Sequence, residues 1–384
     1  MSAARHIAVV TGSRADYGLL LWPIKRLLEE PSFKLSVIAT GMHLAPEFGM
    51  TVDQIVADGI PIAMKVPILG KGDDATAMAE AIGKGVAGFA QAFDQLRPDL
   101  VLLLGDRYEI FAAAQAAFVK KIPIAHLCGG DVTDGALDDA FRHSISKMAS
   151  LHFPTNADAA RRLRQLGEAE NRIHVVGSTG IDAILRAPQI AAGDLERSLG
   201  HALSGRYLLA TFHPVTLDAL PSLDQLNELL AALEAIDPAI TIVFTLANAD
   251  ADGRALNAAI EAFSKRRANT FAHASLGPER YLNLMRRAAA VVGNSSSGLY
   301  EAPSFDVPTV NIGRRQDGRL RASSVIDCAP DRKAIGDAIQ KALALRPEGT
   351  VNPYGDGEAS ARIVAVLKEI SDWSGLVYKK FQDL

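Results

Sequence analysis

Short apolar runs alternate with helix-period stretches from the start of the chain. The apolar runs predict β-strands at residues 6–11, 35–40, 100–104, 123–127, 152–154 and 173–176. Between them, apolar positions spaced three and four apart predict helices that include residues 17–29, 75–96 and 137–149. This alternation is typical of a parallel, doubly wound sheet, so we expect an α/β fold.

The alternation pauses once, near residues 189–205, and then restarts. Apolar runs at 207–211, 241–245, 290–293 and 309–312 predict a second sheet. A chain of 384 residues is also longer than one hydrophobic core normally supports. We therefore expect two Rossmann-like domains. The N-terminal domain covers 1–188 and is joined by the C-terminal segment 359–384, and the other domain covers 189–358.

Composition and charge narrow the classes of protein. The chain is 48% hydrophobic and 22% charged with a formal net charge of −4, which argues against a nucleic-acid-binding surface. Its two cysteines, Cys128 and Cys328, fit a reduced cytoplasm and exclude a disulfide framework. The start of the chain resembles a strand rather than a signal peptide, and no apolar run has membrane-spanning length. We expect a cytoplasmic protein without a membrane partner.

Polar residues follow the first predicted strand in the sequence TGSRADYG. Gly12 allows a tight turn there, and Arg14 then projects over the sheet. A guanidinium can donate two hydrogen bonds at once to a phosphate or a carboxylate. The alternative is that Arg14 caps carbonyl groups or pairs with Asp16. The segment lacks the G-x-G-x-x-G fingerprint, so a dinucleotide cofactor is not expected.

Charged side chains also follow two later strands. Asp106 and Arg107 come after residues 100–104, and Asp131 comes after residues 123–127. Ligands of open α/β sheets bind beyond the carboxyl ends of the strands. Carboxylates that converge there are candidates for moving protons. No grouping of His, Cys and carboxylate residues has metal-ligand spacing, so we expect no catalytic metal.

The segment GALDDAFRH predicts a helix with Asp138 and Asp139 in its first turn. Asp138 and Arg142 are four residues apart, as are Asp139 and His143, so each pair shares a helix face. A carboxylate beside an arginine stays ionised and oriented. The alternative is that both acids complement the positive end of the helix. One of the two is expected to be structural, and the spacing does not distinguish them.

Two histidines stand directly after predicted strands. His213, in TFHPVT, follows residues 207–211, and His43 has the same relation to residues 35–40. A lone histidine is more often packed or solvated than catalytic. The place of each at the carboxyl end of a strand, where ligands bind, favours a role in the site.

The sequence GNSSSGLYEAP follows residues 290–293. The hydroxyls of Ser295 and Ser296, with free amides at the start of a helix, make an anion site. Glu301 falls about two turns into that helix, where a buried carboxylate can accept both hydroxyls of a ribose. The alternative is a serine cap and a solvated glutamate.

A basic, glycine-rich loop, NIGRRQDGR, comes next. Arg314, Arg315 and Arg319 fit a diphosphate there as well as they fit solvent. We also count Asn248 among the expected substrate contacts.

Nine segments, in order along the chain, carry a resemblance to one enzyme family. They are GSRADYG, GDRYEI, IPIAHLCGGD, GALDDAFRHSISKMASLHF, VVGSTGID, TFHPVT, GNSSSGLYEAP, NIGRRQDGR and PYGDG. Together they span nearly the whole chain, which resembles the hydrolysing UDP-N-acetylglucosamine 2-epimerases.

The resemblance implies a GT-B architecture, with two Rossmann-like domains and the active site in the cleft between them. It implies elimination of UDP to a 2-acetamidoglucal, inversion at carbon 2 and addition of water. The product is a free sugar such as N-acetylmannosamine, used to make sialic-acid-type sugars. The partner is then a UDP-sugar, with no cofactor, and we expect a homodimer or homotetramer.

The resemblance also implies roles for residues. Asp106 and Asp138 match acid/base carboxylates of the family, and His213 matches the histidine near the leaving diphosphate. The matched binding positions are Ser295 and Ser296 for phosphate, Glu301 for ribose, and Arg14, Arg107 and Arg315 around the diphosphate and sugar. We also expect Arg142, His143 and His43 to bind substrate.

One position departs from the family pattern. Two residues after His126, many members carry a catalytic glutamate, whereas this chain has Cys128. A carboxylate appears three residues later as Asp131. Either Asp131 takes over the proton transfer, or the substrate differs. Related enzymes act on UDP-2,4-diacetamido-2,4,6-trideoxyglucose, on the way to legionaminic-type acids.

Three other functions share parts of this pattern. A GT-B glycosyltransferase would need a separate acceptor and would cause no exchange at carbon 2. A non-hydrolysing epimerase would return a nucleotide-linked sugar. A nucleotide-sugar sensor would keep Ser295, Glu301 and Arg315 but would not need three acids after the strands, so the acids count against it.

Overall fold

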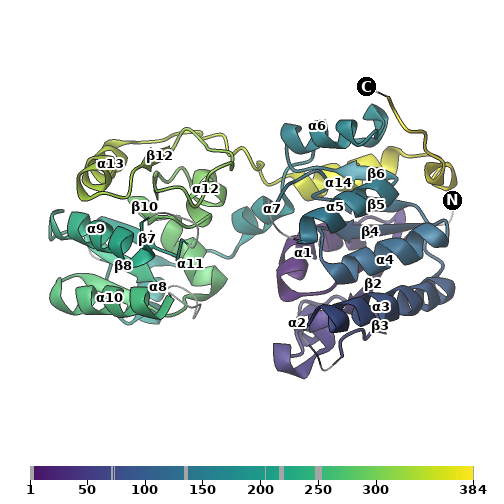
Figure 1. Ribbon diagram of the computed structural model, residues 1–384, viewed down its shortest axis with the longest axis horizontal. Helices are drawn as coiled ribbons and strands as arrows, with labels where there is room; N and C mark the ends of the chain where they lie inside the picture. The colour runs from purple at the N-terminus through teal and green to yellow at the C-terminus, as the bar shows by residue number, and fades with distance from the viewer. Residues whose placement is uncertain are drawn as a thin grey trace. The chain divides into compact units, whose positions relative to one another are not determined.

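The computed structural model describes residues 4–70, 72, 74–133, 137–203, 205–215, 220–246 and 253–383. The chain divides into two compact units (Figure 1). Unit 1 is Met1–Ala183 with Gly355–Leu384, and unit 2 is Ile184–Tyr354. The chain thus leaves unit 1, builds unit 2 in one contiguous stretch and returns to unit 1. The boundaries expected from the sequence, after residues 188 and 358, lie a few residues later in the chain than the boundaries of these units.

Unit 1 is built on a six-stranded parallel sheet in the order β3-β2-β1-β4-β5-β6. Its strands are β1 (Arg5–Thr11), β2 (Phe33–Thr40), β3 (Ile62–Val66), β4 (Leu100–Leu104), β5 (Ile124–Leu127) and β6 (Leu151–Phe153). The strand order reverses between β1 and β4. Ligands of such sheets bind at the carboxyl edge of this switch point.

Helices cover both faces of the unit 1 sheet (Figure 1). The helices of unit 1 are α1 (Arg14–Glu29), α2 (Val52–Ala57), α3 (Ala75–Leu96), α4 (Tyr108–Val119), α5 (Leu137–Met148), α6 (Ala157–Gln165) and α14 (Ala359–Glu369), and α7 (Thr179–Arg186) begins in unit 1 and ends in unit 2. Successive residues of a strand point to opposite faces. In β1, Ile7 and Val9 therefore pack with α1 and α14, whereas Ala8 and Val10 pack with α3 and α4.

Unit 2 repeats this plan with the order β12-β11-β10-β7-β8-β9. Its strands are β7 (Tyr207–Thr211), β8 (Thr241–Thr245), β9 (Thr270–His273), β10 (Ala290–Gly293), β11 (Thr309–Ile312) and β12 (Val325–Cys328). Its helices are α8 (Ala192–Leu199), α9 (Ser222–Glu234), α10 (Gly253–Arg266), α11 (Gly277–Met285), α12 (Ser297–Tyr300) and α13 (Arg332–Ala344). The predicted fold class, α/β with two Rossmann-like sheets, is confirmed, and the unit 2 switch point lies between β7 and β10.

Residues 173–176 do not form the predicted strand. The N–H groups of His174 and Val176 donate to the carbonyls of His152 and Pro154 at 2.9 and 3.1 Å. A parallel ladder would need a return bond from residue 154, and proline has no N–H to donate. Only an isolated bridge to β6 forms. This prediction was wrong because a proline on the neighbouring segment interrupts the pairing.

The C-terminal segment after α14 lies against unit 1, near α6 (Figure 1). Lys379 donates to the carboxylate of Glu168 at 2.7 Å and to the carbonyl of Ala149 at 2.8 Å. Glu168 is buried and also contacts Lys147 at 2.8 Å and His152 at 3.0 Å. Hydrogen bonds from His152, Lys147 and Lys379 hold the pKa of Glu168 low, at about 2, against the effect of its burial.

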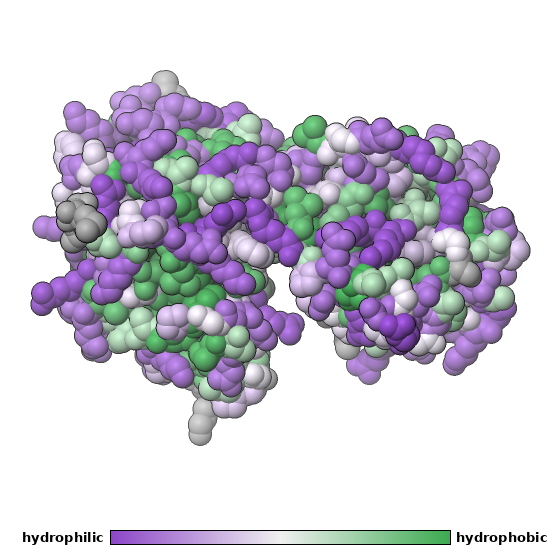
Figure 2. All heavy atoms as spheres, turned by 180° about the vertical axis from the view of Figure 1, so that it is seen from behind, coloured by the Kyte–Doolittle hydropathy of each residue, from purple (hydrophilic) through white to green (hydrophobic). Residues whose placement is uncertain are grey.

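Hydrophilic residues cover much of the visible face of each unit, with apolar areas between them (Figure 2). Most large apolar side chains of the strands are buried within each unit. Among the helices that the structure describes, none has the length and apolar character needed to cross a membrane.

Candidate active site

The turns after β4 and β5 bring charged side chains together at the carboxyl edge of the unit 1 sheet. Arg142 of α5 donates hydrogen bonds to Asp106, to Asp139 at 3.3 Å and to the hydroxyl of Thr133 at 2.9 Å. Asp139 accepts a further bond from the backbone N–H of Thr133 at 2.7 Å. Arg142 is only 7% exposed. The Asp106 carboxylate is therefore held by a guanidinium that is shielded from bulk water.

The structure separates the two acids that spacing left equivalent. Asp139 pairs with Arg142 and lies 3.4 Å from Nε2 of His143. Asp138 is exposed, and its charge helps to raise the pKa of Asp106. Asp139 therefore organises the start of α5, while Asp138 is open to solvent. The expected pairing of Asp138 with Arg142 is replaced by the pair with Asp139, three residues before the arginine.

Burial raises the pKa of both Asp106 and Asp131 above the ordinary range. Arg142 opposes the shift at Asp106, because a cation favours the charged carboxylate. At Asp131 the main opposing group is the Thr155 hydroxyl, which lies 3.0 and 3.2 Å from the two carboxylate oxygens. Fixed carboxylates with raised pKa values suit proton transfer near neutral pH.

The turn after β5 is tight and carries Cys128 in the left-handed region, at φ +63°. Burial and the neighbouring Asp131 carboxylate raise the pKa of the Cys128 thiol, which is therefore neutral at pH 7. At Gly130, φ is +81°, and a Cβ atom would lie 2.2 Å from the carbonyl of Ala159. Glycine thus lets the chain pass close to α6 and bring Asp131 against Thr155.

His126 has a structural role that the sequence did not predict. In the sequence it only marks the position of Cys128. It is fully buried in β5, with Nε2 2.7 Å from the carbonyl oxygen of Gly105 and Nδ1 3.1 Å from the Ser146 hydroxyl. Burial lowers the pKa of His126 to about 3. The ring is therefore neutral, so Nε2–H donates to Gly105 and Nδ1 accepts from Ser146. His126 holds the turn that carries Asp106. The one sequence signal for this role is a histidine within an apolar strand.

A second group of charges surrounds Arg107. Its Nε lies 2.6 Å from Oε1 of buried Glu109 and 3.9 Å from Oδ2 of Asp16. Burial raises the pKa of Asp16 to about 6. Asp16 thus pairs with Arg107, rather than with Arg14 as the alternative reading allowed. Arg14 is exposed in the first turn of α1.

His43 lies in a 3-10 turn, Gly41–Leu44, after β2 and has no exposed surface. Its ring nitrogens are 3.0 Å from the Thr11 hydroxyl and 2.8 Å from the Thr51 hydroxyl. Burial lowers the pKa of His43 to about 4. A neutral ring with both nitrogens engaged has no group to offer a ligand, so His43 is not among the proposed ligand contacts.

The carboxyl edge of the unit 2 sheet carries the second set of expected residues. His213 follows β7, and both of its backbone groups bond the side chain of Asn294 after β10. Arg315 donates to the carbonyl of Asn294 at 3.2 Å. The Ser295 hydroxyl accepts a bond from the N–H of Ser297 at 3.3 Å. The β7–β10 switch point thus gathers a histidine, an arginine and serines.

Helix α12 is a single turn, so Glu301 stands just past its end and not two turns into it. Pro303 follows closely and cannot continue the helical hydrogen bonds. The carboxylate of Glu301 is buried, with Oε2 lacking a hydrogen-bond partner. Burial raises the pKa of Glu301 to about 7, and a hydrogen bond from Ser297 opposes the shift. Such a carboxylate can accept hydrogen bonds from the hydroxyl groups of a ligand.

Asn248 lies outside the described residues. Within the described ranges, no three His, Cys, Asp or Glu side chains are grouped as ligands of one metal ion.

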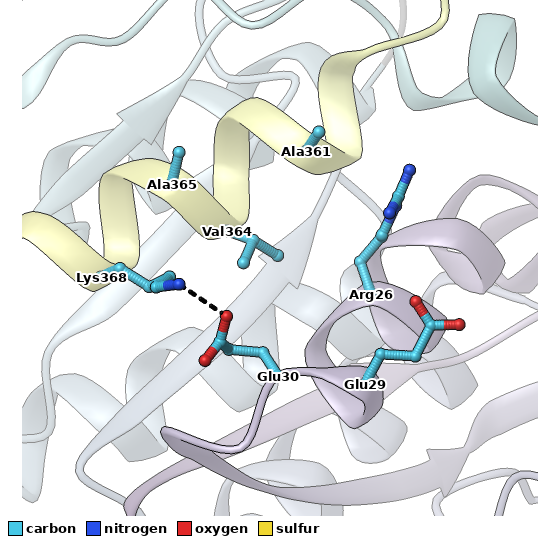
Figure 3. A pocket seen from close by; sticks show the side chains of 7 residues that line it. All are labelled: Arg26, Glu29, Glu30, Ala361, Val364, Ala365 and Lys368. Carbon is cyan, nitrogen blue, oxygen red and sulfur yellow. Dashed lines mark hydrogen bonds and ion pairs between the residues drawn. The ribbon is translucent and has the colours of Figure 1, made fainter.

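A groove on unit 1 lies away from these residues, between α1 and α14 (Figure 3). Its lining residues are Arg26, Glu29, Glu30, Ala361, Val364, Ala365 and Lys368. Lys368 and Glu30 pair across it at 2.8 Å. Because α1 ends just before β2 begins, the groove is at the amino edge of the sheet, opposite the acids.

Comparisons with known proteins agree with this architecture. The profile described as UDP-N-acetylglucosamine 2-epimerase matches residues 25–368. A Campylobacter jejuni protein named GDP/UDP-N,N'-diacetylbacillosamine 2-epimerase (hydrolyzing) is 39% identical over 326 residues, 84% of each chain. A Legionella pneumophila UDP-N,N'-diacetylbacillosamine 2-epimerase (hydrolyzing) is 34% identical over 375 residues, 98% of each chain.

A solved structure has the same two-domain, GT-B-like fold. It is the UDP-GlcNAc 2-epimerase from Neisseria meningitidis bound to UDP-GlcNAc, with a TM-score of 0.80, 19% identity, and coverage of 95% of this chain and 100% of that one. The fold and the sequence relatives lead to one conclusion: the chain belongs to the UDP-N-acetylglucosamine 2-epimerase family.

Proposed function

We propose that this enzyme is a hydrolysing 2-epimerase, which converts a UDP-linked 2-acetamido sugar and water into UDP and the free 2-epimeric sugar. The observation that carries the proposal is the pair of fixed carboxylates, Asp106 and Asp131, at the carboxyl edge of the unit 1 sheet. Burial shifts the pKa of both carboxyls upward, which is the direction that favours a group that must take up and release a proton. Family membership supplies the reaction class.

The proposed reaction has two steps. A base removes the proton on carbon 2, the electron pair forms a double bond between carbons 1 and 2, and the bond from carbon 1 to the diphosphate oxygen breaks. This releases UDP and a 2-acetamidoglucal. Water then adds hydroxyl to carbon 1, while a proton reaches carbon 2 on the face opposite to the first one. Two proton-carrying groups are therefore needed.

Each unit supplies some of the side chains proposed to act in the reaction. Asp131 is the proposed base, because the neutral thiol of Cys128 cannot serve as one. Asp106, held by Arg142, and exposed Asp138 are the partners that return a proton and activate water. The proposed ligand contacts of unit 2 are His213, Ser295, Ser296 and Arg315 for the departing diphosphate and Glu301 for the ribose. Those of unit 1 are Arg14, Arg107, Arg142 and His143.

The proposed substrate is a UDP-2,4-diacetamido-2,4,6-trideoxyhexose, ahead of UDP-N-acetylglucosamine. Two hydrolysing relatives, 39% and 34% identical, are named for UDP-diacetylbacillosamine substrates. The free product then leads to legionaminic-type rather than sialic-type acids. The reaction is proposed to be metal-independent, because arginines and backbone amides can stabilise the leaving diphosphate. A cytoplasmic homodimer or homotetramer is proposed from the family resemblance.

The test is a panel of UDP-sugars, incubated in heavy water with EDTA and followed by proton NMR. We expect free sugar and UDP from the diacetamido substrate, with deuterium at carbon 2. A nucleotide-linked epimer would identify a non-hydrolysing enzyme. A requirement for an added acceptor, without exchange at carbon 2, would identify a glycosyltransferase. Activity lost to EDTA and restored by magnesium or manganese would contradict metal independence.

A further inference from the structure

The side chain of Asn294 bonds both backbone groups of His213. Its Oδ1 accepts from the His213 N–H at 2.7 Å, and its Nδ2 donates to the His213 carbonyl at 2.9 Å. A backbone N–H can only donate and a carbonyl can only accept, so the two bonds also fix the orientation of the amide. Asn294 has no exposed surface. One buried side chain therefore holds the main chain of the candidate histidine from both sides.

These two bonds extend the pairing of β7 with β10 past the last residues of the two strands. The parallel pairing of β7 with β10 ends at the partners Thr211 and Gly293. His213 comes two residues after Thr211, and the amide of Asn294 bonds its backbone there in place of a strand. The histidine is thus held at the switch point of unit 2, although it lies outside the regular sheet.

Asn294 is itself anchored through its backbone. Its N–H donates to the Thr211 carbonyl at 3.2 Å, and its carbonyl accepts from Gln316 at 2.8 Å and from Arg315 at 3.2 Å. Gly293 permits this approach, because its φ is +139° and a Cβ there would lie 1.8 Å from the Thr211 carbonyl oxygen. The side chain of Asn294 thus fixes His213 while its carbonyl fixes Arg315.

We propose that Asn294 is a positioning residue that sets the His213 ring and the Arg315 guanidinium in register with each other. This inference rests on the proposed function, which assigns both side chains to the leaving diphosphate. Groups that stabilise a departing charge act best when they are held in place before the bond breaks. A misplacement of about 1 Å can cost roughly a hundredfold in rate. Asn294 has no exposed surface, so it acts through these neighbours.

Two substitutions and one matched control test the proposal in the full-length enzyme. Asn294→Asp keeps the shape and the acceptor but places a carboxylate oxygen against the His213 carbonyl. Asn294→Ala removes both bonds. The control is Asn283→Ala, because Asn283 is also a fully buried asparagine of unit 2, and its side chain bonds the backbone of Ile190 and Pro188.

We expect both Asn294 variants to lose about a hundredfold in kcat, with UDP affinity by calorimetry reduced less than roughly tenfold. Asn283→Ala should lower the melting temperature and leave kcat near that of the parent. Equal losses of kcat in the Asn283 and Asn294 variants would show that Asn294 is only a structural residue. If Asn294→Ala fails to fold, the nearly isosteric Asn294→Asp still decides.

A second readout does not depend on turnover. The ¹⁵N resonances and pH titration of the His213 ring, assigned by their loss in His213→Gln, should change in both Asn294 variants and stay unchanged in Asn283→Ala. A folded Asn294→Asp with the parent's His213 titration and kcat would overturn the proposal. If the parent releases no UDP from any sugar, the proposed function fails, while the His213 titration still decides the role of Asn294.

Discussion

Arg142 on α5 donates a hydrogen bond to the carboxylate of Asp106 on the turn after β4. This bond joins two segments that are 36 positions apart in the chain. The arginine favours the charged form of the acid, whereas burial favours the neutral form. The balance leaves Asp106 with a raised pKa in a fixed position, which is the state that a group exchanging protons needs.

Asp106→Asn removes this charge and keeps the shape of the side chain. We expect turnover to fall about a hundredfold or more. UDP affinity should change little, because Asp106 is not among the proposed contacts of the diphosphate or the ribose. NMR kinetics and calorimetry give the two quantities. The control is Asp94→Asn, which removes an exposed carboxylate that pairs with Lys120. Near-normal turnover in Asp106→Asn would make Asp106 structural.

Asp131→Asn should abolish both product formation and deuterium incorporation at carbon 2. Cys128→Ser should keep most of the activity, because the pKa of the thiol is raised and a neutral thiol is no base at pH 7. Thr155→Val, which removes the hydroxyl beside Asp131, should give an intermediate loss. The assignment would be wrong if Asp131→Asn still exchanged deuterium, or if a properly folded Cys128→Ser were inactive.

The double change Ser295→Ala with Ser296→Ala should weaken UDP binding. Each charge-assisted hydrogen bond lost costs about 1.5–3 kcal/mol. Calorimetry with UDP measures the effect directly. Ser198→Ala is the control, since that hydroxyl bonds only the carbonyl of Leu195 within α8 among its described contacts. Unchanged UDP affinity in the double variant would remove this segment from the site.

Glu301 should make stability depend on pH. Burial raises its pKa from 4.5 to about 7, so the folded protein binds more protons than the unfolded chain between these values. The resulting stabilisation is complete below pH 4.5 and is lost as the pH rises through 7. Glu301→Gln, which is neutral at every pH, should therefore exceed the parent in stability at pH 8 by up to about 3 kcal/mol.

Denaturant unfolding at pH 4.5, 6 and 8 would measure the free energy of unfolding of both proteins. The difference between them should shrink toward the acid end of this range. Parallel curves would contradict a raised pKa at Glu301. The same variant should bind UDP more weakly at pH 8, since an amide lacks the second acceptor oxygen that a carboxylate offers to a ribose.

Lys379→Met should lower the free energy of unfolding by about 1.5–3 kcal/mol, the range for hydrogen bonds to charged groups. The change removes one of the cations that compensate the buried Glu168 carboxylate. Lys380→Met is the control, because Lys380 is exposed and adjacent in sequence. Its effect should stay within about 0.5 kcal/mol. Equal effects of the two changes would show that the Glu168 contact contributes nothing.

The strands that sequence predicted best are the central ones. Residues 100–104, 207–211, 241–245, 290–293 and 309–312 match β4, β7, β8, β10 and β11. Such strands are buried on both faces and read as continuous apolar runs. The missed strands, β3, β9 and β12, are at sheet edges and only partly buried, so their sequences carry a weaker apolar signal.

The candidate site was predictable in position but not in pairing. Strand ends located Asp106, Asp131 and His213, because the carboxyl edge follows from the parallel topology. Spacing within one helix did not reveal that Arg142 reaches across to Asp106, since that contact depends on tertiary packing. The sequence also did not predict that His43 is buried, because a histidine has the same sequence signal whether it is packed or exposed.

The order of the units along the chain has a consequence for synthesis on the ribosome. Unit 2 is one contiguous stretch, whereas unit 1 is complete only when Gly355–Leu384 has been made. Ile363 and Leu367 of α14 belong to the unit 1 core and pack with α1. At about 5–20 residues per second, α1 emerges roughly 20–70 seconds before α14. We therefore expect unit 2 to finish folding first, while the nascent N-terminal half keeps an open apolar face that chaperones must shield.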